Sequence, residues 1–522
     1  MDSLHCYLCS SVSLRYAFKI DTYPLYVCND CGMTFFKPPV HSHKEIPQNL
    51  EKSTHKNHDR LQTAHSELYL GDMESYIQKK KETDKKSLLG IGSGGLDFLQ
   101  VAKNRGYEVK GIEPKPIPKD YPELEGKIQQ TDVENLEWNS FDKFDICVLF
   151  NIIGQVKDPI HFLQNVQKIL KDNGILYVVT PSLDSMAAKI SKGKWFEFRK
   201  QNIYYFNTQT LQSLLIKAGF KDLYTFQDYK ILNIEHFYNS KKKLRLPIFS
   251  PYNPKFLGKN SLQITKSGMG VACIKKSTPK AKQKLSIVMP VFNEVSSFST
   301  VVEQVLNKEL EDVEKEIIIV ESNSTDGTKE KVMEYENKPG VKIVYETTPQ
   351  GKGHAVRNGL DIATGDIILI QDADLEYDVD DYDALIEPIL KYQKMFVLGS
   401  RHTGSWKMRT MTDNKLVAFV MNIGQMVFTW MINITCGVKL KDPFTMYKVF
   451  RKECLYGLNF TANRFDFDWE IVIKFIRKKY YPIEIPVNYT SRSYSEGKKV
   501  KIFKDPFLWI MALIKYRYLT KL

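Results

Sequence analysis

The chain has 522 residues, of which 43% are hydrophobic, and this length and composition predict two or three globular domains and exclude a largely unfolded chain. The formal net charge is +13, which indicates affinity for an anionic partner: nucleic acid, an acidic membrane surface or phosphorylated substrates. The N-terminus has no basic region followed by an apolar run, so we expect no secretory signal.

A small metal site is the first predicted element. Two Cys-x-x-Cys pairs lie near the N-terminus, formed by Cys6, Cys9, Cys28 and Cys31. Gly32 follows the second pair, where a zinc knuckle needs a tight turn. Four thiolates close the tetrahedral shell of zinc and leave no position for a substrate, so we predict a structural zinc ribbon over residues 1–40. Four unligated, partly buried cysteines are the alternative.

Residues 67–276 alternate predicted strands and helices. Residues 87–95 read as a short strand that runs into a glycine-rich turn, and the strand over residues 109–113 ends in Glu113. In a nucleotide-binding βαβ unit the glycines let the backbone approach the ligand, and the acid accepts hydrogen bonds from ribose hydroxyls. Further strands and helices follow to about residue 181, which predicts a Rossmann-like domain.

The order and wording of these segments resemble class I S-adenosylmethionine-dependent methyltransferases. More narrowly, a four-cysteine ribbon ahead of such a domain resembles the zinc-ribbon methyltransferases that modify sugars or surface polysaccharides. The resemblance implies S-adenosylmethionine as cofactor. It assigns the methionine part, the ribose and the adenine end of that cofactor, in this order, to Gly92, Ser93 and Gly94, to Glu113, and to Asp132.

Several positions depart from the pattern of that family. Gly90 stands where an acid is usual, and Leu96 stands where a third glycine is usual. Gly154 and Gln155 replace a Glu-His pair, and Asn202 replaces a frequent histidine. The loss of the acid and the bulk of Leu96 would weaken cofactor binding. An active methyltransferase and a degenerate structural domain therefore both stay open.

A second α/β series begins at residue 285, after a charged linker over residues 277–284. Predicted strands recur to about residue 399 with helical patterns between most of them, which indicates a mostly parallel sheet. Polar residues follow the strands, namely Asn293, Glu294, Glu321, Ser322, Asn323, Asp372, Asp374, Ser400 and Arg401. Ligands bind at the carboxyl ends of the strands in such sheets, so we predict a site at this edge.

The run over residues 367–377 organises that site. A buried strand delivers Asp372 and Asp374 with one small residue between them. Two carboxylates suit a hard divalent cation that keeps waters and phosphate oxygens as its other ligands, and Glu376 is a candidate third ligand. A surface loop with solvated acids is the alternative.

The C-terminal segments resemble family-2 glycosyltransferases of the GT-A fold, specifically the polyprenyl- or dolichyl-phosphate sugar synthases. The matching motifs are Pro290-x-x-Asn293-Glu294, Ser324-Thr325-Asp326-Gly327-Thr328, Gly351-Lys352-Gly353, Asp372-Ala373-Asp374, Gly399-Ser400-Arg401, Asp442-Pro443-x-Thr445, and Arg492 with Glu496-Gly497-Lys498-Lys499. The resemblance implies a nucleotide-sugar donor, a lipid-linked phosphate acceptor and a Mg or Mn ion. The donor-binding residues that it implies are Pro290, Asn293, Glu294, Glu321, Ser322, Lys352, Asp372, Arg492, Lys498 and Lys499. Glu321 and Ser322 replace two frequent aspartates, which leaves the nucleotide open.

The chemistry follows from charge. A metal on Asp372 and Asp374 stabilises the negative charge of the departing nucleotide diphosphate. Basic side chains are candidates to hold the phosphates of donor and acceptor, or are solvated surface charge: Arg401, Arg492, Lys498 and Lys499. A phosphate acceptor needs no general base, and in-line attack inverts the anomeric centre. A hydroxyl acceptor needs one, for which Asp466 or Asp468 could serve; as the alternative, both acids complement a helix N-terminus.

Two apolar segments suggest a membrane surface. Residues 416–438 contain no charged side chain and are long enough to span a bilayer, but polar residues interrupt them, so we favour helices lying at the membrane interface. Residues 506–514 are too short to span and are followed by basic residues, so they read as an interfacial anchor or as a core helix.

The sequence thus predicts an α/β protein with a ribbon (1–40), a methyltransferase-like domain (67–276), a glycosyltransferase domain (285–500) and a membrane-interface segment (501–522). We expect an enzyme that moves glucose or mannose from a nucleotide to a polyprenyl phosphate. The alternative is transfer to a glycan hydroxyl in surface polysaccharide synthesis, with a noncatalytic N-terminal half. We expect a cytoplasmic protein, peripheral on the inner membrane face, with no nucleic-acid partner; the oligomeric state stays open.

Overall fold

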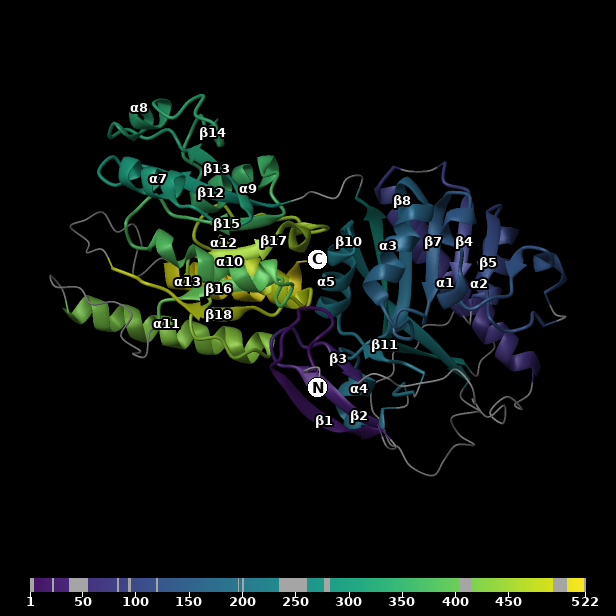
Figure 1. Cartoon of the computed structure of the whole chain (residues 1–522). Helices are drawn as coiled ribbons and strands as arrows, with labels where there is room; N and C mark the ends of the chain where they lie inside the picture. The colour runs from purple at the N-terminus through teal and green to yellow at the C-terminus, as the bar shows by residue number, and fades with distance from the viewer. Residues whose placement is uncertain are drawn as a thin grey trace. The chain divides into compact units, whose positions relative to one another are not determined.

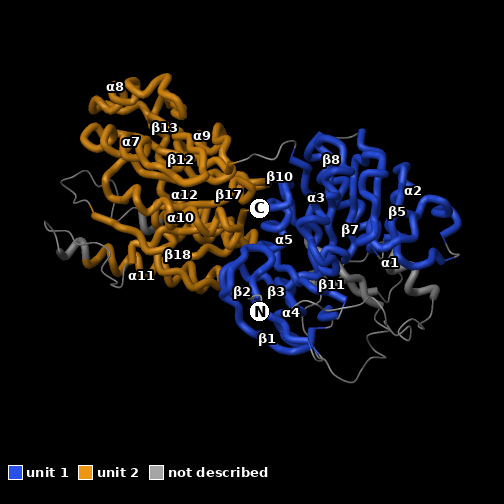
Figure 2. The backbone as a smooth tube through the Cα atoms, viewed as in Figure 1, with its two compact units in different colours: residues 1–279 blue, residues 280–522 orange. Residues whose placement is uncertain are grey.

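The structure is a computed structural model, and it describes residues 4–20, 23–36, 55–81, 84–92, 95–118, 121–195, 197–199, 201–233, 261–276, 282–402, 415–491 and 505–520. The chain divides into two compact units, Met1–Pro279 and Lys280–Leu522 (Figure 2). Each unit is built on its own seven-stranded mixed sheet (Figure 1), and unit 1 carries a further small sheet. The predicted α/β class is confirmed.

The small sheet joins the ribbon to the rest of unit 1. Its order is β1-β2-β3-β9, with β1 (Leu14–Ile20), β2 (Tyr23–Cys28), β3 (Thr34–Phe36) and β9 (Tyr204–Tyr205). β3 pairs with β9 across a gap of more than a hundred residues, with Phe35 opposite Tyr204. Phe36, Trp195 and Tyr205 share one buried cluster under this sheet. The ribbon therefore shares both a sheet and a core with residues near 200.

The large sheet of unit 1 has the order β10-β11-β8-β7-β4-β5-β6. Its strands are β4 (Ser87–Ile91), β5 (Glu108–Ile112), β6 (Ile128–Gln129), β7 (Phe144–Phe150), β8 (Leu170–Pro181), β10 (Phe220–Asn233) and β11 (Ser261–Lys275). β4 to β8 run parallel, and β10 and β11 are antiparallel additions. The main helices are α1 (His55–Lys79), α2 (Leu96–Asn104), α3 (Pro159–Ile169), α4 (Met186–Ser191) and α5 (Thr208–Lys217).

The sheet of unit 2 has the order β14-β13-β12-β15-β17-β16-β18. Its strands are β12 (Gln283–Val291), β13 (Val313–Glu321), β14 (Val341–Tyr345), β15 (Ile367–Ile370), β16 (Phe396–Ser400), β17 (Lys448–Arg451) and β18 (Ile483–Pro486). β12 to β15 are parallel, as expected, but β17 lies antiparallel between β15 and β16. The main helices are α7 (Phe298–Asn307), α8 (Thr328–Met333), α9 (Lys352–Ile362), α10 (Tyr382–Leu390) and α12 (Phe467–Arg477).

Helix α11 (Lys415–Cys436) in unit 2 buries polar side chains and exposes apolar ones. The polar side chains of Asn422, Gln425 and Thr429 are buried. The apolar side chains on the other face are between 41% and 63% exposed, namely Phe419, Val420, Ile423, Met426, Val427, Trp430 and Ile434. Among the described residues it is the one helix that is long and apolar enough to cross a membrane, over Phe419–Cys436. A water-facing helix would show the opposite arrangement.

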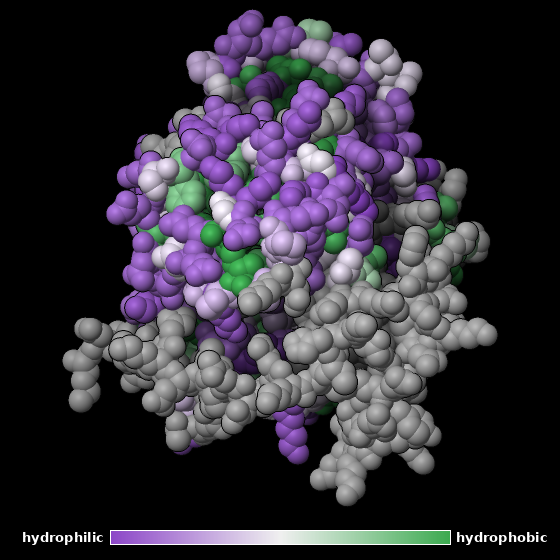
Figure 3. Space-filling model, turned by 90° about the vertical axis from the view of Figure 1, so that its right-hand side faces the viewer, coloured by the Kyte–Doolittle hydropathy of each residue, from purple (hydrophilic) through white to green (hydrophobic). Residues whose placement is uncertain are grey.

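The C-terminal helix α13 (Asp505–Ile514) also exposes apolar residues, among them Met511 and Ile514. The π-helical segment after it, Lys515–Leu519, is held against α12, because Arg477 donates hydrogen bonds to the carbonyl oxygens of Tyr516 and Thr520. A different surface is seen in Figure 3, where most of the described residues facing the viewer are hydrophilic and the hydrophobic ones form small, separate patches. The apolar faces of α11 and α13 therefore call for a specific partner.

Candidate active site

A cavity of about 750 Å³ lies at the carboxyl ends of β12, β13 and β15 in unit 2. Three strand ends contribute polar residues that line it: Glu294 after β12, Ser322 after β13, and Asp372, Asp374 and Glu376 after β15. Lys352, the first residue of α9, and Pro290 line it as well. Sequence residues spread over more than eighty positions are thus brought together at one sheet edge.

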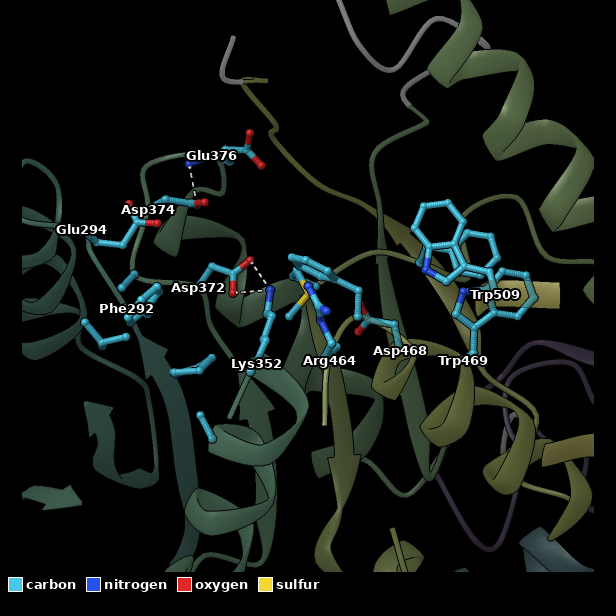
Figure 4. A pocket seen from close by; sticks show the side chains of 18 of the residues that line it. Phe292, Glu294, Lys352, Asp372, Asp374, Glu376, Arg464, Asp468, Trp469 and Trp509 are labelled. Atoms are coloured by element: carbon cyan, nitrogen blue, oxygen red, sulfur yellow. Dashed lines mark hydrogen bonds and ion pairs between the residues drawn. The ribbon is translucent and has the colours of Figure 1, made fainter. Parts of the chain in front are cut away.

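The cavity has two chemically different ends (Figure 4). The carboxyl groups of Asp372 and Asp374 lie at one end, and the indole rings of Trp469 and Trp509 lie at the other. Phe428 completes the aromatic end, with its ring centroid 5.6 Å from that of Trp469 and 5.2 Å from that of Trp509. One end therefore suits charged groups and the other suits an apolar chain.

Asp372 is paired with a lysine at the charged end. The Lys352 Nζ lies 2.6 Å and 2.7 Å from the two Asp372 carboxylate oxygens. Burial lowers the pKa of Lys352, but the neighbouring charges of Asp372 and Asp468 outweigh it and raise that pKa overall. Lys352 is consequently a fixed positive charge at the foot of the site.

The predicted metal ligands line the cavity but do not form a ready-made cage. Asp374 accepts a hydrogen bond from the backbone N–H of Glu376 at 3.1 Å, and Glu376 accepts one from Tyr489 Oη at 3.2 Å. Among the described residues, the cysteines form the only group of three or more acidic, cysteine or histidine side chains whose ligand atoms gather closely enough to hold an ion. Asp372 and Asp374 fit a cation that takes its remaining ligands from phosphate and water.

Arg401 lines the cavity but is already paired. Its guanidinium donates to both Asp442 carboxylate oxygens, at 2.8 Å from Nε and 2.7 Å from a terminal nitrogen, and both side chains are nearly or fully buried. A bidentate pair of this kind fixes the β16 end against the loop before β17. Arg401 therefore offers less to a phosphate than its sequence position suggests.

Asn293 and Glu321, which the sequence predicts to bind the nucleotide-sugar donor, instead accept hydrogen bonds from backbone N–H groups of a neighbouring loop. Asn293, in the left-handed region at φ 50°, accepts from the Thr325 backbone N–H at 2.9 Å. Glu321 is fully buried and accepts from the backbone N–H groups of Asn323 and Ser324. Neither residue lines the cavity, whereas their neighbours Glu294 and Ser322 do.

The acids of the Arg464–Glu470 run are also separated by the fold. Asp468 lines the cavity and pairs with the fully buried Lys448 at 2.6 Å, whereas Asp466 lies at the start of α12 and accepts from Tyr516 Oη at 3.3 Å. Of the two candidate bases, the structure thus brings Asp468 to the site and leaves Asp466 outside it. Arg492, Lys498 and Lys499 lie outside the described residues.

Sequence reasoning missed Arg464, which stands between the two ends of the cavity (Figure 4). Its guanidinium makes no ion pair with any residue that the structure describes. The loop that carries it is held closely, because Gly351 and Gly353 leave no room for a side chain against Asn463 and Ala462. Arg464 lies two residues before Asp466, one of the candidate bases, but only the fold places it at the cavity.

The four cysteines of unit 1 gather into one buried cluster. Their sulfur atoms all lie within 4.8 Å of one another, with Cys6 and Cys31 at 3.5 Å and Cys9 and Cys28 at 3.6 Å. These distances exceed a disulfide bond and are close to the roughly 3.8 Å expected between thiolates on one tetrahedral zinc. The cluster fits a metal ion with a closed shell.

The predicted cofactor residues of unit 1 lie at the ends of β4, β5 and β6. Gly92 adopts φ 107°, and a Cβ atom there would meet the Phe150 carbonyl oxygen at 2.5 Å, so only glycine fits. Glu113 is buried, and burial raises its pKa. Asp132 accepts from the backbone N–H of Glu134 at 3.0 Å. Ser93 and Gly94 lie outside the described residues.

The departures from the methyltransferase pattern have local explanations. A Cβ atom on Gly90 would meet Leu99 of α2 at 3.0 Å, so a close helix contact occupies the place of the usual acid. A Cβ atom on Gly154 would meet the Tyr204 carbonyl oxygen at 2.7 Å, and the Gly154 oxygen accepts from the Ile203 and Tyr204 backbone N–H groups. Strand β9, which is shared with the ribbon, therefore rests on this loop.

Comparison with known families agrees with the two sheets. Residues 286–458 match the model of glycosyl transferase family 2, and residues 65–225 match a methyltransferase domain. The chain carries a family 2 glycosyltransferase domain and a methyltransferase domain. The predicted resemblances are thereby confirmed at the level of these families.

Curated relatives match the glycosyltransferase domain. Dolichol-phosphate mannosyltransferase of Pyrococcus furiosus is 29% identical over 236 residues, 45% of this chain and 64% of that protein. Dolichyl-phosphate beta-glucosyltransferase of Trichomonas vaginalis is 28% identical over 232 residues, 42% of this chain and 68% of that protein. The chain thus spans slightly less than two thirds of the first relative, and the glycosyltransferase domain is distantly related to polyprenyl-phosphate sugar transferases.

Solved structures are similar to each half. Glucosyl-3-phosphoglycerate synthase from Mycobacterium tuberculosis, in complex with Mn²⁺, uridine-diphosphate-glucose and phosphoglyceric acid, has a TM-score of 0.35 and 18% identity over 46% of this chain and 82% of that chain. An S-adenosylmethionine-dependent methyltransferase from Thermotoga maritima has a TM-score of 0.26 and 22% identity over 42% of this chain and 95% of that chain.

Proposed function

We propose that the glycosyltransferase domain moves a sugar, glucose or mannose, from a nucleotide donor to a polyprenyl phosphate, with inversion and with a Mg or Mn ion. The observation that carries this proposal is the two-ended cavity, which joins acids and Lys352 to the aromatic end formed by Phe428, Trp469 and Trp509. A phosphate on an apolar chain is the kind of acceptor that needs both ends.

The charged end supplies the donor site. Asp372 and Asp374 would hold the metal, which stabilises negative charge on the departing diphosphate. Lys352 holds the Asp372 carboxylate and adds a positive charge beside it. Glu294 and Ser322 border the space beyond the acids, on the side of β12 and β13.

Arg464 is our candidate to bind the acceptor phosphate. Its side chain is exposed, it lines the cavity, and its loop is clamped by Arg357, which donates to the Phe460 carbonyl oxygen and to Asn463. A guanidinium matches phosphate oxygens in geometry and charge. An acceptor phosphate is already anionic, so this chain needs no general base for it.

The exposed apolar face of α11 supports a membrane surface as partner. Val420 lines the cavity and is also 48% exposed, so the cavity lies beside the outward apolar face of α11. α13 contributes Trp509 to the cavity and exposes Met511 and Ile514. A lipid-linked acceptor could then stay partly in the bilayer while its phosphate reaches Arg464. We accordingly propose peripheral binding at the cytoplasmic face of the membrane.

The test uses the purified full chain, a panel of radiolabelled nucleotide sugars and a short-chain polyprenyl phosphate in detergent. We expect a product that partitions into organic solvent, is labile to mild acid and fails to form with EDTA. Asp374→Asn should lower kcat by at least ~100-fold because it removes a metal ligand. Asp380→Asn, on an exposed aspartate outside the cavity, is the matched control. Label that appears only in water-soluble glycan would contradict the proposal.

Transfer to a glycan hydroxyl is a second candidate, because Asp468 lines the cavity where a general base is needed. The same radiolabel assay separates the two candidates if it includes an oligosaccharide acceptor. Radiolabelled sugar attached to the oligosaccharide, with no product in the organic phase, would favour this second candidate.

For unit 1 we propose zinc on the four cysteines and binding of S-adenosylmethionine at the ends of β4 and β5. The close backbone approach at Gly92 and the buried Glu113 support a cofactor site. The tight contacts at Gly90 and Gly154 support the alternative of a noncatalytic binding module. Calorimetry of the full chain with S-adenosylmethionine decides between them, and absence of heat would remove the methyltransferase activity.

A further inference from the structure

A hydrogen-bonded network of two buried side chains, Glu346 and Ser322, and two partly buried ones, His354 and Asn358, lies directly behind the cavity, at the ends of β13 and β14. The Glu346 carboxylate, whose side chain is 3% exposed, is its centre. It accepts from Ser322 Oγ at 2.6 Å, from Asn358 Nδ2 at 2.7 Å, and contacts His354 Nδ1 at 2.5 Å. Of these side chains only Ser322 lines the cavity.

We propose that Glu346, held by His354 and Asn358, is a positioning residue that fixes the Ser322 hydroxyl as a hydrogen-bond acceptor toward the base of the nucleotide donor. This inference rests on the proposed function, because it presumes a nucleoside diphosphate in the cavity. It adds a chemical class for the base, namely one that presents an imide-type N–H, as uracil and guanine do.

The Ser322 hydroxyl donates its hydrogen to Glu346. A hydroxyl has one hydrogen to donate and lone pairs to accept with. A carboxylate can only accept, so the Ser322 hydrogen points to Glu346 and the lone pairs are what the hydroxyl has left for a ligand. The His354 Nδ1 contact at 2.5 Å holds the carboxylate from the α9 side.

Ser322 lies two strands away from the acids along the sheet edge. Asp372 follows β15, and Ser322 follows β13, with β12 between these strands. Two strand spacings put the two ends about 10 Å apart. A diphosphate at the acids has the aromatic end on one side, so its nucleoside extends to the other side, over β12 and toward Ser322.

Burying the Glu346 carboxylate is unfavourable unless hydrogen bonds compensate for it. Glu346 has one partner just after β13, Ser322, and two on α9, His354 and Asn358. Its backbone N–H already joins β14 to the Glu321 carbonyl oxygen at 2.8 Å, so the side chain is not needed for that pairing. A fixed acceptor at Ser322 favours uracil and guanine, whose ring N–H can donate to it, over cytosine and adenine, whose ring nitrogen at the corresponding position carries a lone pair.

Calorimetry on the full chain with Mn²⁺ tests the proposal, using UDP, GDP, CDP, ADP and inorganic pyrophosphate as probes. We expect UDP or GDP to bind at least ~10-fold more tightly than CDP and ADP, because a mismatched base leaves buried acceptors unpaired. Glu346→Gln and Ser322→Ala should each lower affinity for the preferred nucleotide by ~10-fold and leave pyrophosphate affinity unchanged. Ser322→Thr, which keeps the hydroxyl, should retain the wild-type preference for UDP or GDP over CDP and ADP.

Glu316→Gln is the matched control. Glu316, on β13, is another buried carboxylate that accepts from a serine hydroxyl, Ser286 Oγ, at 2.5 Å, but it does not line the cavity. This variant should lower thermal stability without changing nucleotide preference. Equal binding of all four nucleotides, or a Glu346→Gln variant that loses only thermal stability, would overturn the inference. Failure of the wild-type chain to bind pyrophosphate would overturn the proposed function itself.

Discussion

The ammonium group of Lys448 lies 2.6 Å from the carboxylate of Asp468, and the lysine is completely buried while the aspartate faces the cavity. Burial lowers the pKa of Lys448, so the pair depends on Asp468 to keep the lysine charged. Lys448 also donates to the Thr445 carbonyl oxygen. The carboxylate of Asp468, which lines the cavity, is thereby held in place by a buried lysine of β17.

Replacing Asp468 tests what this pair does. Asp468→Asn leaves a buried cation without its partner and should cost about 3–5 kcal/mol of unfolding free energy, measured by urea denaturation. If the acceptor is a phosphate, kcat of the folded variant should fall by less than ~10-fold, because no base is required. A loss of ~100-fold or more with unchanged KM would instead identify Asp468 as a general base.

Arg464→Gln should raise the KM for a short-chain polyprenyl phosphate by ~10- to 100-fold, since a hydrogen bond to a charged group is worth about 1.5–3 kcal/mol. The KM for the nucleotide sugar should change little, and Arg464→Lys should recover part of the loss. Lys391→Gln removes an exposed charge paired with Glu387 and is the control. Equal increases in both KM values would show that Arg464 serves the donor instead.

The Arg401–Asp442 pair predicts a specific dependence of stability on pH. Burial alone would raise the pKa of Asp442, but the Arg401 charge and its hydrogen bonds outweigh burial and hold that pKa below its usual value. A carboxyl with a lowered pKa contributes stability above its unfolded value, near 3.9, and the contribution is lost as pH falls through the folded pKa.

Unfolding free energy of the wild type should therefore drop below about pH 4 in part through Asp442. Asp442→Asn should lose about 3–5 kcal/mol at pH 7 and show a flatter acid limb in denaturant titrations from pH 7 to pH 3. Asp380→Asn, on an exposed residue, is the control and should keep the wild-type slope. An unchanged slope in Asp442→Asn would contradict the assignment.

Metal removal from the cysteine cluster should disturb the β9 region as well as the ribbon. Strand β3 pairs with β9, and Trp195 packs in the cluster under that sheet. A strong chelator should release one zinc per chain and shift tryptophan emission to the red, with loss of near-ultraviolet dichroism. The shift should be smaller in Trp195→Phe. Zinc release without any spectral change would contradict a shared core.

Local motifs predicted the parts of the site that depend on neighbouring residues in sequence. The paired cysteines, the Asp372-Ala373-Asp374 run and the alternating strands each carry their signal within a short window. The parallel sheet edge then follows from chain topology alone. These features gave the α/β architecture and both domain families.

Pairings between distant side chains could not be predicted in this way. Arg401 reads as a free phosphate ligand until Asp442 is seen beside it. Arg464 reads as a flanking residue until Gly353 is seen under its loop. Strand β17 was missed because its charged residues, Lys448 and Arg451, suggest a surface, whereas the fold buries both. In each case the partner comes from another element, and sequence spacing holds no record of it.

The outward apolar face of α11 has a practical consequence for catalysis by this chain. If Trp430 and Ile434 rest in a lipid leaflet, the enzyme explores a plane instead of a volume when it searches for a lipid-borne acceptor. Turnover would then follow the surface density of acceptor in the vesicle, and diluting vesicles at constant composition would leave the rate per bound enzyme unchanged.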